Sequence, residues 1–270
     1  MRTRLDVELV RRGLARSREH AAALVAGGSV TVDGRPVAKS AWRVDAATSI
    51  TAASDAASYV SRGALKLLGA LDVFAGDGLT VAGARCLDAG ASTGGFTQVL
   101  LERGARQVIA VDVGSGQLSS VLREDPRVVV REHTNARSLR PADIGGVVDL
   151  AVADLSFISL TLVLPALVGC IAPPGDDPRG GDLVVMVKPQ FEVGRERLGA
   201  GGVVRDPVHR AEALQTVAAA AGTLGLGVAG ATSSMLPGPA GNVEYFLWLR
   251  RDAPAADPAA LISVVSDGPA

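Results

Sequence analysis

Four charged residues adjoin strongly apolar segments, where a charge is costly unless it is paired. Asp154 directly follows the apolar run 147–153, and Lys188 directly follows the run 183–187. Glu244 stands at the start of another apolar run, and Lys66 lies in an apolar helical pattern further upstream. Any one of them could simply cap a strand. Four at one sheet edge would instead favour chemistry such as orienting a hydroxyl group and accepting its proton.

A glycine-rich stretch, residues 85–96, predicts a ligand-binding turn between a strand and a helix. Gly90, Gly94 and Gly95 let the backbone pass close to a ligand. Free N–H groups at the start of the helix would favour a polar group. Asp112 ends the next strand, 22 positions after Gly90 (112 − 90), near the spacing of a carboxylate that holds a nucleotide ribose. The alternative is a turn that serves only packing.

The glycine spacing differs from that of the dinucleotide-binding fingerprint. It is Gly-x-x-x-Gly-Gly, and Asp88 lies two residues before Gly90. A carboxylate there would repel a pyrophosphate and would tolerate a cationic or amino-bearing ligand. The pattern therefore predicts a nucleoside-binding crevice at the carboxyl ends of parallel strands.

The elements that must position these residues alternate between strands and helices. A helix that opens this domain with segment 59–67 is expected to run on to about residue 74, and the last two strands should form an antiparallel hairpin across residues 236–241. The expected strands are 84–88, 107–112, 127–131, 147–153, 182–187, 227–232 and 243–249, and the expected helices are 95–103, 116–123, 158–171 and 207–223. This pattern predicts an α/β domain over residues 59–251 with a doubly wound sheet of about seven strands. Residues 252–270 are rich in Ala, Pro and Asp, and we expect a poorly ordered tail.

Residues 1–58 predict a small α+β domain and a linker. Helical patterns from Leu5 to Gly13 and from Ser17 to about residue 26 precede a hairpin around Asp33-Gly34. A short strand is expected at 49–51, inside the linker. Residues 1–60 carry nine Lys or Arg and six acids, an excess of three positive charges. This asymmetry favours a nucleic-acid partner.

Composition adds few constraints. The 270 residues include 27 Lys plus Arg and 28 Asp plus Glu, so the overall charge indicates no partner. Cys86 and Cys170 lie in apolar runs and should be reduced core residues. No Cys or His cluster has metal-ligand spacing, so we expect no metal. No apolar run is long enough to span a membrane, and no signal core follows Met1, so we expect a cytoplasmic protein. Nothing in the sequence indicates an oligomeric state.

The amino-terminal motifs resemble the S-four RNA-binding domain. The similar segments are Leu5-Asp6, Leu9-Val10, Arg16-Ser17-Arg18 and residues 28–34. The resemblance implies that basic side chains of the two helices contact structured RNA; the candidates are Arg4, Arg11, Arg12, Arg16 and Arg18. Arginine suits phosphate contacts because its planar fork donates two hydrogen bonds. The alternative is a solvated helix face.

The larger domain resembles class I (Rossmann-like) methyltransferases that bind S-adenosylmethionine. Lys66, Asp154, Lys188 and Glu244 match the Lys-Asp-Lys-Glu tetrad of FtsJ-like ribose 2′-O-methyltransferases. Segments 61–67, 88–96, 153–159, 187–191 and 241–246 look like the TlyA family, also labelled haemolysins. With the amino-terminal module, the resemblance covers about residues 4 to 250.

The resemblance implies 2′-O-methylation of cytidine ribose in 16S and/or 23S ribosomal RNA. Lys188 would accept or orient the hydroxyl proton, Asp154 would orient Lys188, and Lys66 and Glu244 would position the hydroxyl. Whether Lys188 is a base or only a positioned charge stays open. The implied S-adenosylmethionine-binding residues are Asp88, Gly90, Ser92, Thr93, Gly94, Gly95, Phe96, Asp112 and Asn135.

One departure and three alternatives accompany this interpretation. Ala57-Ser58-Tyr59-Val60 stands where mycobacterial-type members resemble Arg-x-Trp-Val, so a linker contact through that arginine or tryptophan is in doubt. The alternatives are a nicotinamide-dependent oxidoreductase, a pore-forming cytolysin, and a non-catalytic RNA-binding assembly factor. A cytolysin should carry an export signal and a membrane-active stretch, and an assembly factor should tolerate the loss of Lys188.

Overall fold

The chain forms two compact units, Met1–Arg62 and Gly63–Ala270. The computed structural model describes residues 3–12, 14–15, 18–45, 47–52, 59–175 and 180–268. Ser17 and the linker residues Ala57 and Ser58 lie outside the described residues. Each unit has its own apolar core.

The amino-terminal unit packs two helices against short strands. Its elements are β1 (Thr3–Arg4), α1 (Leu5–Arg11), α2 (Arg18–Ala26), β2 (Val30–Val32), β3 (Arg35–Pro36), β4 (Arg43–Val44) and β5 (Ile50–Ala52). The strands pair as β3-β2-β5 and as β1-β4. Asp33 and Gly34 have φ of 48° and 75°, the left-handed backbone that a tight two-residue hairpin requires. The expected hairpin is formed by β2 and β3, and the strand expected near residues 49–51 is β5.

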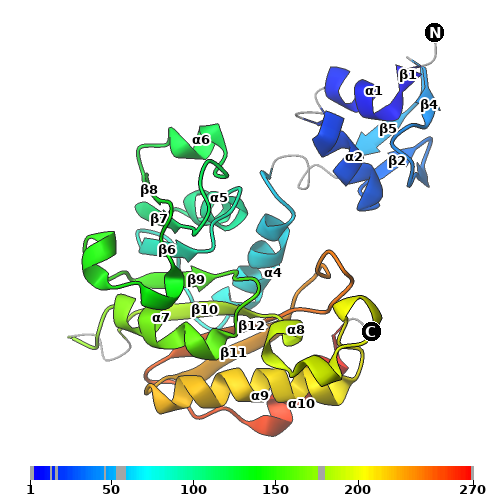
Figure 1. The fold of residues 1–270 in the computed structure, drawn as a ribbon. Coiled ribbons are helices and arrows are strands. Elements are labelled where there is room, and N and C mark those ends of the chain that lie inside the picture. The colour runs from blue at the N-terminus through cyan, green and yellow to red at the C-terminus, as the bar shows by residue number, and fades with distance from the viewer. Residues whose placement is uncertain are drawn as a thin grey trace. The chain divides into compact units, whose positions relative to one another are not determined.

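The larger unit contains a seven-stranded sheet in the order β11-β12-β10-β9-β6-β7-β8. The strands are β6 (Arg85–Ala89), β7 (Gln107–Val111), β8 (Val128–Arg131), β9 (Leu150–Ala153), β10 (Asp182–Val187), β11 (Gly227–Ser233) and β12 (Tyr245–Arg250). Only β12 runs antiparallel to its neighbours β10 and β11. The seven-strand prediction and the final hairpin are confirmed (Figure 1).

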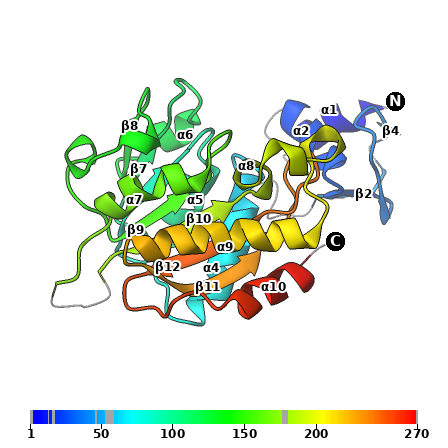
Figure 2. The ribbon, with the colours of Figure 1, turned by 60° about the horizontal axis from the view of Figure 1, so that its bottom comes forward.

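Helices cover both faces of this sheet. They are α4 (Gly63–Ala75), α5 (Gly95–Glu102), α6 (Ser120–Arg123), α7 (Leu164–Cys170), α8 (Pro189–Glu192), α9 (Pro207–Thr223) and α10 (Pro258–Ser266). In Figure 2, α9 lies in front of the sheet and α4 lies behind it. Cys86 and Cys170 are buried free thiols, and burial raises the pKa of Cys86 to about 12 and that of Cys170 to about 11. Both are core residues, as expected.

Two predicted helices are shorter than the sequence pattern indicated. The helix expected at 158–171 begins only at Leu164, after a 3-10 turn at Leu160–Leu162 that Ser159 caps. Pro165 lacks an N–H and fits the first turn of α7, where no intrahelical donor is needed. The helix expected at 116–123 is reduced to α6, because Gly116 has φ of 67° and Ser119, with ψ of 139°, is also outside the helical conformation.

The prediction of a poorly ordered tail differs from the structure, because residues 258–266 form α10. Asp257 caps this helix by accepting a hydrogen bond from Ala259 N (2.9 Å), and Pro258 occupies the first turn. Leu261 and Val265, one helical turn apart, are buried, and α10 packs on α9 and β11. Asp206 and Pro207 begin α9 in the same way, so this local capping signal outweighs the Ala- and Pro-rich composition of the tail.

Within the described residues, no helix combines the length and apolarity needed to cross a membrane. Over the same part of the chain, no group of three His, Cys, Asp or Glu side chains is arranged to hold a metal ion.

Candidate active site

The turn between β6 and α5 requires glycine at two positions. Gly90 has φ of 89°, and a Cβ there would collide with the backbone carbonyl of Asp154. Gly94 has φ of 100° at the start of α5, and a Cβ there would collide with the side chains of Leu118 and Leu122. The two glycines let this turn approach the next strand end and α6 closely.

A cavity of about 560 Å³ lies beside this turn, at the carboxyl ends of β6, β7 and β9. Four of the predicted cofactor-binding residues line it: Gly90, Ser92, Asp112 and Asn135. The Asp112 carboxylate accepts hydrogen bonds from the backbone N–H groups of Ser92 and Gly114, both at 2.8 Å. Asn135 Oδ1 accepts from Arg137 N at 2.9 Å. The structure therefore gathers these side chains around one ligand-sized space.

The other predicted cofactor residues support the turn and do not line the cavity. Asp88 is fully buried in β6, where Oδ2 accepts a hydrogen bond from Thr97 Oγ1 at 2.7 Å. Oδ1 has no hydrogen-bond partner among the described residues, and burial raises the pKa of Asp88 to about 7. Phe96 is buried, with its ring 6.1 Å from that of Phe246. Thr93, Gly94 and Gly95 complete the turn.

Replacing Asp112 by alanine should weaken binding of S-adenosylmethionine and leave the fold intact. The change removes a carboxylate from the cavity wall and two hydrogen bonds that shape the turn. Losing hydrogen bonds to a charged group should cost about 1.5–3 kcal/mol of binding free energy. Calorimetric titration with S-adenosylmethionine measures the effect, with an unfolding curve as control. Wild-type affinity in the variant would remove Asp112 from the site.

A lysine–carboxylate pair lies at the rim of this cavity. Lys188 Nζ is 2.5 Å from Asp154 Oδ1 and donates a hydrogen bond to Ser156 Oγ at 3.0 Å. Both partners are partly buried, with exposed side-chain fractions of 12% and 25%. Oδ1 makes no well-aligned hydrogen bond, so charge attraction holds the contact. Asp154 and Ser156 also line the cavity, so they connect its wall to Lys188.

A second pair, Lys66–Glu244, is more deeply buried. Lys66 Nζ on α4 donates to Glu244 Oε2 at 2.5 Å, and the exposed side-chain fractions are 9% and 2%. Two opposite charges at this depth compensate each other, whereas either alone would be strongly unfavourable. Gly238 leaves room for the Glu244 carboxylate, because a Cβ at this position would lie 2.6 Å from Glu244 Oε1.

The sheet register explains why these residues meet. Ala153 of β9 pairs with Val185 of β10, and Val187 of β10 pairs with Tyr245 of β12. Asp154, Lys188 and Glu244 are the residues just beyond these strand ends, so they stand at one edge of three adjacent strands. The structure thus brings the four predicted residues to that edge as two ion pairs.

Sequence reasoning missed an aromatic pair beside the lysine. The rings of Phe157 and Phe191 lie 5.3 Å apart at 50°, and Phe157 is 91% exposed. Phe157 also has φ of 64°, a conformation rarely adopted by a bulky residue. A signal existed, because each phenylalanine follows its partner of the Asp154–Lys188 pair by three residues.

The candidate RNA-binding arginines divide into two groups around buried acids. Arg4 and Arg18 both contact Asp6, at 2.9 and 3.4 Å. Their side chains are 42% and 64% exposed, so both remain accessible to a ligand. The RNA-binding role of this group therefore stays a prediction that its exposure allows. Arg16 lies outside the described residues.

The second group surrounds Glu8. Hydrogen bonds from Arg11 and Arg12 lower the pKa of this buried carboxyl to about 2. Arg12 also donates to the carbonyls of Thr48 and Asp45, at 2.8 and 3.0 Å. Arg12 therefore holds the loop before β5 in place. This geometry favours a structural role for Arg12 over the expected RNA contact. Arg11, by contrast, is 62% exposed.

Arg12→Ala should therefore affect stability, whereas Arg18→Ala should affect RNA binding. Arg12→Ala should lower the free energy of unfolding by about 1–3 kcal/mol, because three acceptors lose a charged donor. Arg18→Ala should leave stability unchanged and should reduce RNA affinity and its salt dependence. Urea unfolding and RNA titration over a range of salt concentrations separate the two. Equal stability losses in both variants would contradict this division.

The sheet order, the cavity and the paired lysines define the class of protein as a methyltransferase. The FtsJ-like methyltransferase family matches residues 59–251, and the S4 domain matches residues 3–50. The chain is 57% identical over 274 residues to the 16S/23S rRNA (cytidine-2′-O)-methyltransferase TlyA of Mycobacterium tuberculosis, covering 99% of each. It belongs to the TlyA family of ribosomal RNA (cytidine-2′-O)-methyltransferases.

Two further relatives carry the name hemolysin. Hemolysin A of Brachyspira hyodysenteriae is 35% identical over 246 residues, which cover 90% of this chain and 97% of the relative. A solved structure from Streptococcus thermophilus, also named as a hemolysin, is 40% identical, with a TM-score of 0.75. That match covers 98% of this chain and 95% of the other. The family match excludes the nicotinamide-dependent oxidoreductase considered from the sequence.

Proposed function

We propose that this protein methylates the 2′-hydroxyl of cytidine in 16S and/or 23S ribosomal RNA, with S-adenosylmethionine as the methyl donor. One observation carries the proposal. Asp154 lines the cavity and also holds Lys188 at 2.5 Å, so the donor site and the proposed proton-handling group share one residue. The family and the relatives support the same activity.

The donor fits the residues that line the cavity. A volume of about 560 Å³ lies within the range of roughly 300–1,000 Å³ typical of small-molecule sites. Asp112 uses two hydrogen bonds to backbone N–H groups and retains lone pairs for ribose hydroxyls. Asn135 uses its oxygen to cap the next turn, and its amide nitrogen would face the adenine. When bound, S-adenosylmethionine supplies an electrophilic methyl group on its sulfonium.

The chain's own residues must then handle the hydroxyl proton. A ribose hydroxyl is a poor nucleophile and needs a proton acceptor or an orienting charge as it attacks. Lys188 would contact the hydroxyl, and Asp154 and Ser156 fix the position of its nitrogen. Lys66 and Glu244 would position the same hydroxyl from the start of β12, at the same edge of the sheet.

The two units would divide the work. The amino-terminal unit would supply RNA affinity through the Arg4 and Arg18 group, and the larger unit would supply the chemistry. Because ribosomal RNA is a cytoplasmic substrate, the proposal also places the protein in the cytoplasm. A non-catalytic assembly factor or a cytolysin would not depend on the Asp154–Lys188 pair.

Mapping 2′-O-methyl groups tests this function. Purified protein and S-adenosylmethionine would be incubated with ribosomal subunits that lack the modification, and every 2′-O-methylated position would be mapped. New 2′-O-methylcytidine in 16S or 23S RNA is expected, and heat-inactivated protein is the control. Unmodified RNA would contradict the proposal, and leakage of liposomes by the purified protein would support the cytolysin instead.

A further inference from the structure

Arg137, Arg195 and Arg205 differ from the other arginines that the structure describes in residues 63–268. The others donate to a carboxylate or a backbone carbonyl, as Arg103 does to Asp72. For these three, no such partner exists among the described residues, and all three are exposed. Arg137 lines the donor cavity, beside the site already described. Arg195 and Arg205 have no role in the site described above.

Both of these arginines lie in residues 193–206, the segment that connects α8 to α9. β10 ends at the catalytic edge of the sheet, directly before Lys188 and α8. In a crossover connection, the following helix starts at the edge where the strand ended and runs back along the sheet. The start of α9, and with it Arg205, therefore belongs to the edge that carries the two lysine–carboxylate pairs.

Hydrogen bonds hold the segment, and the end of α8 before it, to residues that neighbour the predicted catalytic residues in the sequence. Asn242 is 2% exposed, accepts from Val204 N at 2.9 Å and donates to Gly202 O at 3.0 Å. Asn242 stands two residues before Glu244 in the sequence. At the other end, Glu192 accepts from Ser159 Oγ at 2.6 Å and from Leu160 N at 2.8 Å. Arg205 is therefore next to a residue that is held directly beside the active site.

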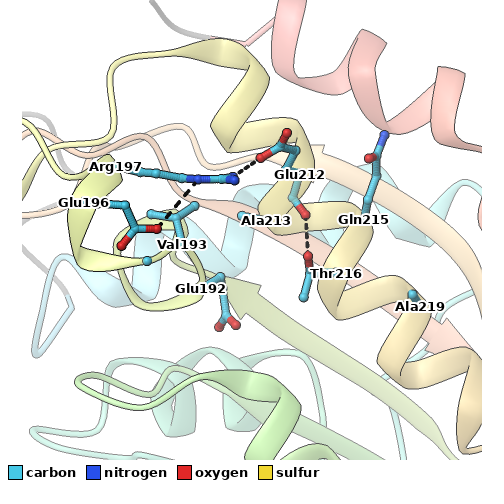
Figure 3. Close-up of a pocket in the computed structure, with 10 residues that line it drawn as sticks. Glu192, Val193, Glu196, Arg197, Glu212, Ala213, Gln215, Thr216 and Ala219 are labelled. Carbon is cyan, nitrogen blue, oxygen red and sulfur yellow. Dashed lines mark hydrogen bonds and ion pairs between the residues drawn. The ribbon is translucent and has the colours of Figure 1, made fainter.

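The arginine between them serves as an internal comparison. Arg197 pairs with Glu212 of α9 and lies 4.0 Å from Glu196, so carboxylates compensate its charge (Figure 3). The guanidinium of Arg205 instead lies over the backbone of Gly199, with Nη1 3.4 Å from the position that a Cβ would take. Arg195 and Arg205 thus flank Arg197 in the sequence. Among the described residues, Arg197 has carboxylate partners and the other two have none.

We propose that Arg195 and Arg205 bind phosphates of the RNA strand that carries the target cytidine. This inference rests on the proposed function and adds a phosphate-binding surface to the methyltransferase unit itself. Guanidinium groups suit this partner because their planar fork donates two parallel hydrogen bonds to a phosphate. The surface would hold the strand beside Lys188 without reading its sequence, since phosphates carry no base information.

The test compares Arg195→Ala/Arg205→Ala with Arg197→Ala in the full chain. The probe is a labelled ribosomal RNA fragment that spans the mapped methylation site, titrated at several salt concentrations. The double variant should bind roughly tenfold more weakly at physiological salt, with a salt slope smaller by about 0.7–0.9 for each arginine. Arg197→Ala should keep the wild-type slope. S-adenosylmethionine affinity should be unchanged in both and reports on the fold.

An Arg195→Lys/Arg205→Lys variant should recover most of the salt slope, because lysine also binds phosphate as a point charge. A wild-type slope in the alanine double variant, or an equal loss in Arg197→Ala, would overturn the inference. These outcomes leave the proposed function intact as long as the wild-type protein still produces 2′-O-methylcytidine. Loss of the proposed function would appear in that wild-type reaction instead.

Discussion

Lys188→Ala is expected to lower the rate of methyl transfer about 10²–10⁴-fold, the usual effect of removing a general base. Lys188 stands just beyond β10 at the rim of the donor cavity, 2.5 Å from Asp154 and 3.0 Å from Ser156. In the proposed reaction its nitrogen would contact the substrate hydroxyl, and Lys188 is not among the residues that line the donor cavity. The S-adenosylmethionine affinity of the variant should therefore remain close to that of the wild type.

Single-turnover methylation and calorimetric titration measure these two effects separately. Lys188→Arg distinguishes a base from a fixed charge, because guanidinium stays protonated. If Lys188 accepts the proton, the arginine variant should be almost as inactive as the alanine variant. Near-normal turnover of Lys188→Arg would show that only a positive charge is needed. Near-normal turnover of Lys188→Ala would remove the residue from the mechanism.

Glu244→Ala is expected to destabilise the methyltransferase unit by about 3–5 kcal/mol, because it leaves the Lys66 ammonium buried without its partner. Counted over the whole residue, Glu244 has 1% of its surface exposed and Lys66 has 7%. Water therefore cannot replace the lost carboxylate without opening the site. Urea unfolding of the full chain measures the loss, and Glu196→Gln, which changes an exposed glutamate, is the matched control.

A double variant separates the structural role of this pair from its catalytic role. Lys66→Met with Glu244→Leu removes both charges at similar volume, and such replacements of buried ion pairs are often neutral or stabilising. The double variant should therefore recover most of the lost stability and still fail to methylate RNA. A double variant that is stable and active would show that the pair only fills the core.

The shared edge of Asp154, Lys188 and Glu244 was predictable, because it follows from the position of the strands in the sequence and from their order and direction in the sheet. Asp154 and Lys188 directly follow buried parallel strands, and Glu244 precedes an antiparallel one. Once the strands are placed in order, the three residues must share an edge. Gly90 was predictable because it lies in a glycine-rich stretch between an expected strand and an expected helix. In the structure, its left-handed backbone and the nearby Asp154 carbonyl exclude a side chain at this position.

Features that depend on side-chain pairing were not predictable in the same way. Arg12 has the same charge as Arg11 and directly follows it at the end of α1, yet two carbonyls from the distant residues Asp45 and Thr48 commit it to a structural role. Asp88 has the spacing of a ligand contact, but its position within β6 buries it completely. Such distinctions depend on segments far apart in the sequence, which periodicity does not address.

The central claim is that the methyl group reaches a cytidine 2′-oxygen, and one substitution in the substrate tests it most directly. Once the modified position is mapped, a ribosomal RNA fragment would be made with 2′-deoxycytidine at that position only. The protein should transfer a methyl group from S-adenosylmethionine to the ribose form and none to the deoxy form, while binding both fragments. Methylation of the deoxy fragment at the same nucleotide would place the methyl group on the base and would contradict the account.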